Sequence, residues 1–186
     1  TGKVASEGTI LADPVLDDGD KATLLQKFRT EQGSTGAARD YLAKLATSTA
    51  PTLNPFSSDD RSLADKSFDV LMQAVQPEQR DAAMLEFVKS SGMVPQAVVD
   101  GVRMSLASTD ATKVSAALEM AAKLSDAAPM ALGTGDASKE VKAAAATYDE
   151  LVNGRGQTAQ QAAQFIIDQR DPEKKAKRDL LKSSFD

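Results

Sequence analysis

The spacing of apolar side chains constrains the fold of this chain more than any other feature. Over most of the sequence these residues recur every three or four positions, as side chains on one face of an α-helix do. Residues 59–75 show the pattern clearly, with Leu63, Phe68, Leu71, Met72 and Val75. No segment alternates apolar and polar residues with an excess of β-branched side chains, so no strand is predicted. The sequence therefore predicts an all-α fold in which more than half of the residues are helical.

Caps and helix breakers divide this pattern into eight or nine short helices. We expect them over residues 21–32, 35–46, 59–75, 77–91, 95–106, 110–128, 137–153, 158–169 and 172–183. Asp20 and either Thr109 or Asp110 are expected to cap helix N-termini, because short polar side chains accept hydrogen bonds from the first free N–H groups, and Thr158 is expected to start another helix. Gly33 and Gly92 are expected to end helices. Short connections favour antiparallel pairs, arranged as a bundle or a short α-solenoid-like array.

A proline-containing loop marks the predicted domain boundary. We expect residues 1–57 to form an N-terminal arm with an irregular lead-in and two helices, and residues 58–186 to form the main helical domain. In the loop between them, Leu53 and Phe56 are expected to pack against the body. Gly33, Gly92 and Gly154 lie nearly 60 residues apart, which is compatible with repeated helical units. Chance spacing among eleven glycines is the favoured explanation, and the sequence does not settle whether the repeat is real.

Composition limits the functions that such a chain can have. Its 186 residues suit one domain or two very small ones, and 31 of them are alanine, which favours close helix packing but buries little area. The net charge of −5 argues against a general nucleic-acid binder. No apolar run reaches the roughly 20 residues of a membrane span, and no signal peptide is recognised. Because the chain begins with Thr1 rather than Met, we expect it to be part of a longer protein.

The sequence gives little evidence for a nucleophilic active site or a cofactor site, because the chain has no histidine and no cysteine. A thiolate nucleophile, a cysteine metal site and a histidine base are thereby excluded. No Ser-x-x-Lys occurs at a suitable turn, and the Glu-Ser start of the lytic transglycosylase motif is absent. Gly133-Thr-Gly135 matches part of a dinucleotide-binding pattern, but no strand precedes it, so a loop is the better interpretation.

Two groups of acidic residues could form a metal site or a catalytic pair, or could simply be exposed to solvent. The aspartates at 13, 17, 18 and 20 do not have the spacing of a calcium-binding EF-hand loop, so a solvated lead-in is favoured. Glu140, Asp149 and Glu150 share a predicted helix with Lys139 and Lys142, and ion pairing explains them adequately. We therefore expect no enzyme, no cofactor and no metal site. A carboxylate-dependent hydrolase remains the less favoured alternative.

Three features are candidates for contact with a partner. The first is the basic run of Lys174, Lys175, Lys177 and Arg178, which suits either a solvated helix or contact with nucleic acid or an acidic helix. The second is the predicted pair of helices at 94–107 and 110–128, whose Val98, Val102, Met104 and Met120 spread over more than one face. That pair is either a partner surface or the buried central hairpin of the fold. The third is the set of six methionines, which suits core packing or a Met-rich binding groove.

One series of helix starts and stops runs from Gly92 to Phe165. Its residues are Gly92-Met-Val-Pro95-Gln-Ala-Val-Val99, Leu106-Ala-Ser108-Thr-Asp110, Ala116-Ala117, Leu124 to Pro129, and Tyr148-Asp-Glu-Leu-Val152-Asn-Gly154. This series resembles segments of the internal virion (ejection) proteins of short-tailed bacteriophages. Met120 departs from the pattern, where an aromatic residue is commoner. The resemblance implies a non-catalytic structural or assembly segment of a larger virion or prophage protein, with genome ejection as the process in which such proteins act.

Partners and location follow from the same resemblance. It implies that the partners are other segments or subunits of the same assembly, with no specific nucleic acid and no membrane span. It places the chain in the virion, or in the bacterial cytoplasm during assembly. A helical adaptor or protein-binding module of a bacterial protein is the alternative, because most of these helix signals would be shared.

Overall fold

The computed structural model describes residues 6–174, and its fold is entirely helical. The chain is 78% helical and the described residues contain no strand, which confirms the predicted all-α fold. The α-helices are α1 (Glu7–Leu11), α2 (Asp18–Ala46), α3 (Ser58–Ala74), α4 (Arg80–Ser91), α5 (Gln96–Leu106), α6 (Ala111–Ala127), α7 (Asp136–Tyr148) and α8 (Ala159–Arg170). Short helical turns at Pro77–Gln79, Ala131–Gly133 and Asp149–Gly154 connect some of them.

The N-terminal arm is longer and straighter than the sequence predicts. α2 is one helix of 29 residues that runs through Gly33 and Gly36, so the prediction that Gly33 ends a helix is wrong. Glycine ends a helix when it adopts the left-handed conformation, and Gly92 and Gly156 are the described glycines with positive φ. Without that conformation Gly33 only weakens the helix, and α3 contacts α2 on both sides of it, through Glu31 and Ala38.

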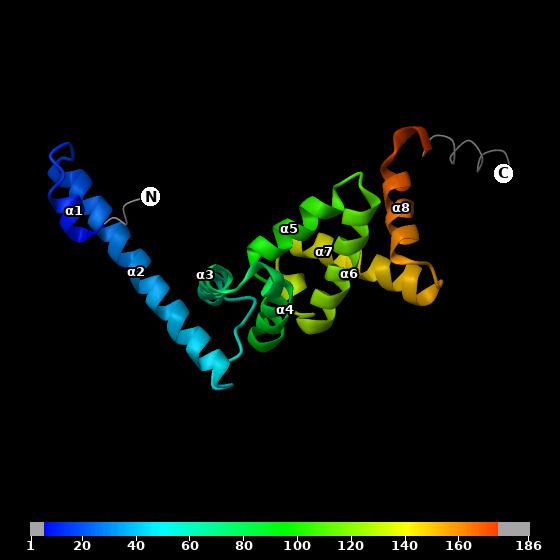
Figure 1. Ribbon diagram of the computed structural model, residues 1–186, viewed down its shortest axis with the longest axis horizontal. Coiled ribbons are helices and arrows are strands. Elements are labelled where there is room, and N and C mark those ends of the chain that lie inside the picture. Colours follow the sequence, from blue (N-terminus) through cyan, green and yellow to red (C-terminus); the bar gives the residue numbers. More distant parts are fainter. Residues whose placement is uncertain (1–5, 175–186) are drawn as a thin grey trace.

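The start of the arm also differs from the prediction. α1 forms within the lead-in that was expected to be irregular, and Ser6 caps it by accepting a hydrogen bond from the Thr9 N–H. The N-cap of α2 is Asp17 rather than Asp20, with the Asp17 carboxylate accepting the Asp20 N–H at 2.8 Å. α1 folds back along the first half of α2, and the two lie at one end of the molecule (Figure 1).

The body of the fold is built around α6, which packs against α4, α5, α7 and α8 (Figure 1). Val114, Leu118 and Leu124 on α6 are fully buried, and small residues such as Ala117 and Ala121 let the neighbouring helices approach closely. Val98 and Val102 of α5 are also buried. The α5–α6 pair is therefore mainly the central hairpin of the fold, the second of the two possibilities that the sequence left open.

The connections are ordered by backbone and side-chain hydrogen bonds. Leu53 is buried, as expected, and its N–H donates to the carbonyl of Ser91 at 3.1 Å. Phe56 is exposed, so its predicted packing is wrong. The turn is fixed by the Asn54 side chain, which accepts the Phe56 N–H, and by Asp60, which accepts the Asn54 N–H. This local turn directs the Phe56 ring into solvent.

A side chain of α3 caps the start of α5. The Gln96 N–H at the first turn of α5 donates to Asp65 Oδ1 at 2.7 Å, because Pro95 at the N-cap has no side-chain acceptor. Burial raises the pKa of Asp65, and the nearby Asp69 adds to this. The contact fixes α5 relative to α3, and these two helices form parts of the groove described next.

Candidate partner-binding groove

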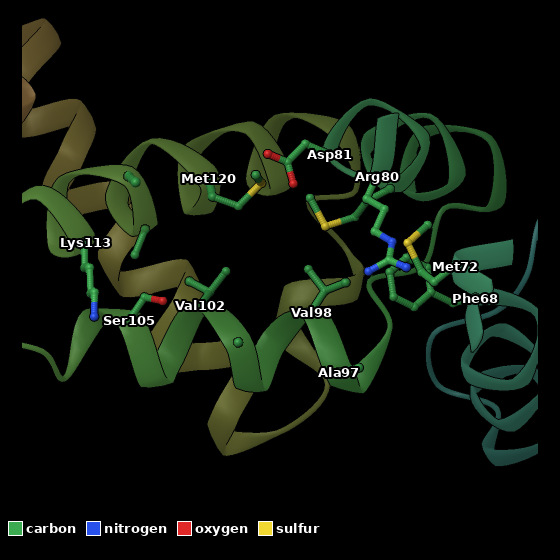
Figure 2. A pocket seen from close by; sticks show the side chains of 14 residues that line it. Phe68, Met72, Arg80, Asp81, Ala97, Val98, Val102, Ser105, Lys113 and Met120 are labelled. Atoms are coloured by element: carbon green, nitrogen blue, oxygen red, sulfur yellow. The ribbon is translucent and has the colours of Figure 1, made fainter. Parts of the chain in front are cut away.

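An apolar groove of about 560 Å³ lies between α5 and α6. Figure 2 shows α5 along one side, α6 along the other, and residues of α3 and α4 at one end. Val98 and Val102 of α5 and Ala117 of α6 form its floor, and these side chains are buried in the body. Grooves of this size with mainly apolar walls are typical binding sites in proteins.

Beside Val98 and Val102, the side of α5 that faces the groove carries only small side chains. Ala97, Gly101 and Ser105 all line the groove and are spaced by four residues, so they share one face of the helix over roughly 12 Å of its length. Gly101 is exposed, and a Cβ built at this position would meet no heavy atom within 4 Å. The backbone of α5 is therefore open to close approach from the groove.

Methionines supply much of the remaining wall. Met72 of α3, Met84 of α4 and Met120 of α6 are half-buried and converge on the groove from three helices. Methionine has a flexible, polarisable side chain that adapts to different apolar partners. Met93 is buried in the core, whereas Met104 and Met130 are exposed, so the six methionines do not share one role. Met72, Met84 and Met120 also pack against the buried core, so the core-packing interpretation holds for four of the six methionines and fails for Met104 and Met130.

Cations lie at the two ends of the groove. Arg80 of α4 lies at one end and Lys113, at the start of α6, lies at the other, while Asp81 of α4 lies beside Met120 between them (Figure 2). Within residues 6–174, neither Arg80 nor Lys113 takes part in an ion pair. Both cations can therefore meet carboxylates of a bound partner.

The predicted contact residues fall into separate places. Val98, Val102 and Met120 come together in the groove. Met104 does not line it and is 77% exposed. Lys174 forms an ion pair with Asp168 at 2.6 Å, while Lys175, Lys177 and Arg178 lie outside the described residues. Sequence reasoning missed Gly101 and its small neighbours, although their spacing by four was a readable signal.

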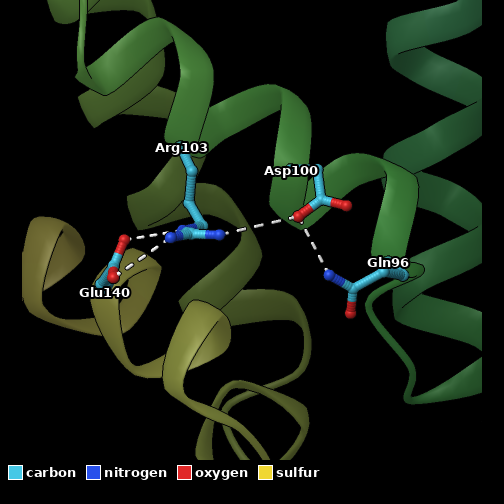
Figure 3. A network of polar contacts seen from close by, with 4 residues as sticks. All are labelled: Gln96, Asp100, Arg103 and Glu140. Carbon is cyan, nitrogen blue, oxygen red and sulfur yellow. Dashed lines mark hydrogen bonds and ion pairs between the residues drawn. The ribbon is translucent and has the colours of Figure 1, made fainter.

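The acids singled out in the sequence take part in exposed polar contacts. Glu140 of α7 accepts two hydrogen bonds from the Arg103 guanidinium, at 2.6 and 3.3 Å (Figure 3). Asp100 lies 3.9 Å from the same guanidinium and accepts a hydrogen bond from Gln96 at 3.0 Å. The hydrogen bond from Arg103 to Glu140 raises the pKa of Arg103, which stays charged. This network connects α5 to α7 away from the groove.

The other two acids of that group also have local partners. Asp149 accepts a hydrogen bond from Asn153, and Glu150 forms an ion pair with Arg155. Lys139 pairs with Asp136 rather than with Glu140. In the part of the chain that the structure describes, no three His, Cys, Asp or Glu side chains lie close enough to hold a metal ion. None of the described helices combines the length and the apolar character needed to cross a membrane.

Comparison with protein-family models, with curated protein sequences and with solved structures finds no match to this chain. The groove and its chemistry are therefore the basis for considering function.

Proposed function

We propose that this chain is a non-catalytic, protein-binding segment of a larger assembly, and that the α5–α6 groove receives an apolar segment of a partner. The observation that carries the proposal is the open apolar groove with a row of small residues of α5 on one side. An amphipathic helix that enters such a groove places side chains at positions i, i+3 or i+4, and i+7 against its floor. Carboxylates near the ends of that helix would face Arg80 and Lys113.

The groove favours a binding module over an enzyme because its polar groups are few. Its lining contains one carboxylate, Asp81, and no second acid that could complete the pair used in glycoside hydrolysis. Its methionines provide adaptable apolar contact rather than chemistry. We expect no turnover of any substrate at this groove.

A peptide-display experiment tests the proposal. A library of amphipathic helices, with apolar residues fixed at helical spacing and the other positions random, is selected against the 186-residue chain. We expect selected peptides to carry acids near their ends and to bind at least about tenfold less well to Gly101→Gln, a loss of roughly 1.4 kcal/mol. The glutamine side chain would occupy the groove, and the open space around position 101 lets the helix accept it.

Met104→Gln is the matched control, because it places the same side chain on the same helix outside the groove. Peptides that bind wild type and Gly101→Gln equally well would contradict the proposal. The proposal also includes a larger assembly, and the resemblance to internal virion proteins supports a virion as that assembly. Detection of this chain in purified phage particles tests that part, and a parent protein little longer than this chain counts against it.

A further inference from the structure

We propose that the groove binds the N-terminal tip of a second copy of this chain, so that copies associate head to tail. The arm tip is defined here as residues 6–24, which include α1, the turn after it and the first turns of α2. This inference rests on the proposed protein-binding function and names the occupant of the groove. Apolar exposure, charge and the position of the tip support it.

The arm tip exposes aliphatic side chains that the chain itself does not cover. Leu11, Val15 and Leu24 are 56%, 89% and 38% exposed, and they are three of the seven large hydrophobic residues exposed in the described part of the chain. Val15 stands on an ordered turn, because the Asp13 carboxylate accepts its N–H at 2.9 Å and Asp17 caps the helix that follows. The tip therefore presents the exposed apolar side chain of Val15 on an ordered turn, and such a side chain can insert into an apolar groove.

The charges of the two surfaces are complementary. The arm tip contains five acids, Glu7, Asp13, Asp17, Asp18 and Asp20, against one basic residue, Lys21. Glu7 is paired with Arg29, so the other four remain to face a partner. The groove presents Arg80 and Lys113 at its ends against the single acid Asp81. A basic segment, such as the run that begins at Lys174, lacks this complementarity.

The tip cannot reach the groove of its own chain. α2 is 29 residues long, about 43 Å, and it is held against α3 by the hydrogen bond from the Ser67 hydroxyl to the Ala38 carbonyl and by the ion pair between Glu31 and Lys66. This places the tip at one end of the molecule, away from α5 and α6 (Figure 1). A contact between the tip of one copy and the groove of another joins two different surfaces and leaves both ends of the pair free to continue.

The contact is expected to be weak, because one turn in a groove of this size buries less area than a standard protein interface. Sedimentation velocity over a concentration series measures it. We expect the average mass of wild type to rise with protein concentration and to rise less when salt is increased from roughly 0.05 to 0.5 M, because salt screens the charges. Wild type that remains monomeric up to about 1 mM, so that the Kd is weaker than roughly 1 mM, would overturn the proposal.

Two variants test which surfaces form the contact between copies. Val15→Asp removes the exposed apolar side chain, and Gly101→Gln occupies the groove. Each is expected to be monomeric alone, with circular dichroism like wild type. Met130→Asp and Met104→Gln change exposed methionines away from both surfaces and are expected to associate like wild type. Association that Gly101→Gln abolishes and Val15→Asp leaves intact would assign the groove to another segment and overturn the inference.

Mixing the two variants gives the decisive result. The Val15→Asp copy keeps an intact groove and the Gly101→Gln copy keeps an intact tip. An equimolar mixture should therefore form dimers and nothing larger, whereas a symmetric interface would not be restored by mixing. Because the chain has no cysteine, Val15→Cys and Ala116→Cys copies should also form a specific disulfide dimer, and Met104→Cys should not replace Ala116→Cys. If the mixture does not associate, but peptides that bind the groove have been selected, head-to-tail association is wrong and the proposed function stands. If no such peptides are found either, both proposals fail.

Discussion

Replacing Gly101 by alanine should stabilise this protein. Position 101 is the sixth of eleven residues in α5, so it lies in the helix interior, where glycine costs roughly 0.5–1 kcal/mol relative to alanine. The added methyl group would meet no heavy atom within 4 Å, so no steric penalty offsets this gain. It also remains exposed and buries little apolar area. We therefore expect the free energy of unfolding to rise by roughly 0.5–1 kcal/mol.

Urea unfolding followed by circular dichroism at the helix band measures the change, and calorimetry should show Tm higher by roughly 1–4 °C for a chain of this length. Gly92→Ala is the matched control, because Gly92 has φ of +71° and its Cβ would lie 3.1 Å from Thr52 Cγ2. That variant should lose roughly 1–2 kcal/mol. A destabilised Gly101→Ala variant would refute the reasoning, since it would mean that the groove is closed over α5 in solution.

Three further substitutions test how the body is held together. Leu118→Ala, at a fully buried position of α6, should lower the free energy of unfolding by about 2–5 kcal/mol in urea titrations, whereas Met104→Ala should change it by less than about 0.5 kcal/mol. Thr158→Ala should cost about 0.5–2 kcal/mol in the same assay, because Thr158 and Gln161 form the capping box of α8. Burial raises the pKa of Asp65, so the folded chain binds the carboxyl proton more tightly than the unfolded chain does. The free energy of unfolding that depends on this group therefore falls as pH rises above about 3.9. Asp65→Asn keeps an acceptor for the Gln96 N–H, and thermal unfolding at several pH values should show its stability relative to wild type rising across that window.

Helix boundaries were predictable where the signal is local. Gly92 adopts the left-handed conformation at the end of α4 and α8 starts at Thr158, both as predicted, and of the two candidates Thr109 and Asp110 it is Asp110 that caps α6. Each of these depends on a few neighbouring residues, so the sequence alone contains the information. Gly33 was not predictable in this way. Whether a glycine ends a helix depends on its φ, and that in turn depends on how the chain packs on either side.

The groove was less predictable, because it depends on how several helices meet. Periodicity shows that Met72, Met84 and Met120 lie on apolar faces, but not that three such faces leave a space between them. The separation of Met93 into the core and Met104 into solvent has the same origin. What the sequence did contain is the spacing of Ala97, Gly101 and Ser105 by four residues. A helix face made only of small residues is a poor choice for a core and a good one for close approach of another segment.

The fixed position of α5 would lower the entropic cost of binding a partner at the groove. Val99 packs its inner face into the core, Asp65 caps its first turn, and Arg103 fastens it to Glu140 of α7. The face with Gly101 is the one left without contacts. Because α5 is already fixed, a partner that enters the groove has little to order and loses less binding free energy to entropy. In an assembly that holds many copies close together, high local concentration would then make a small contact sufficient.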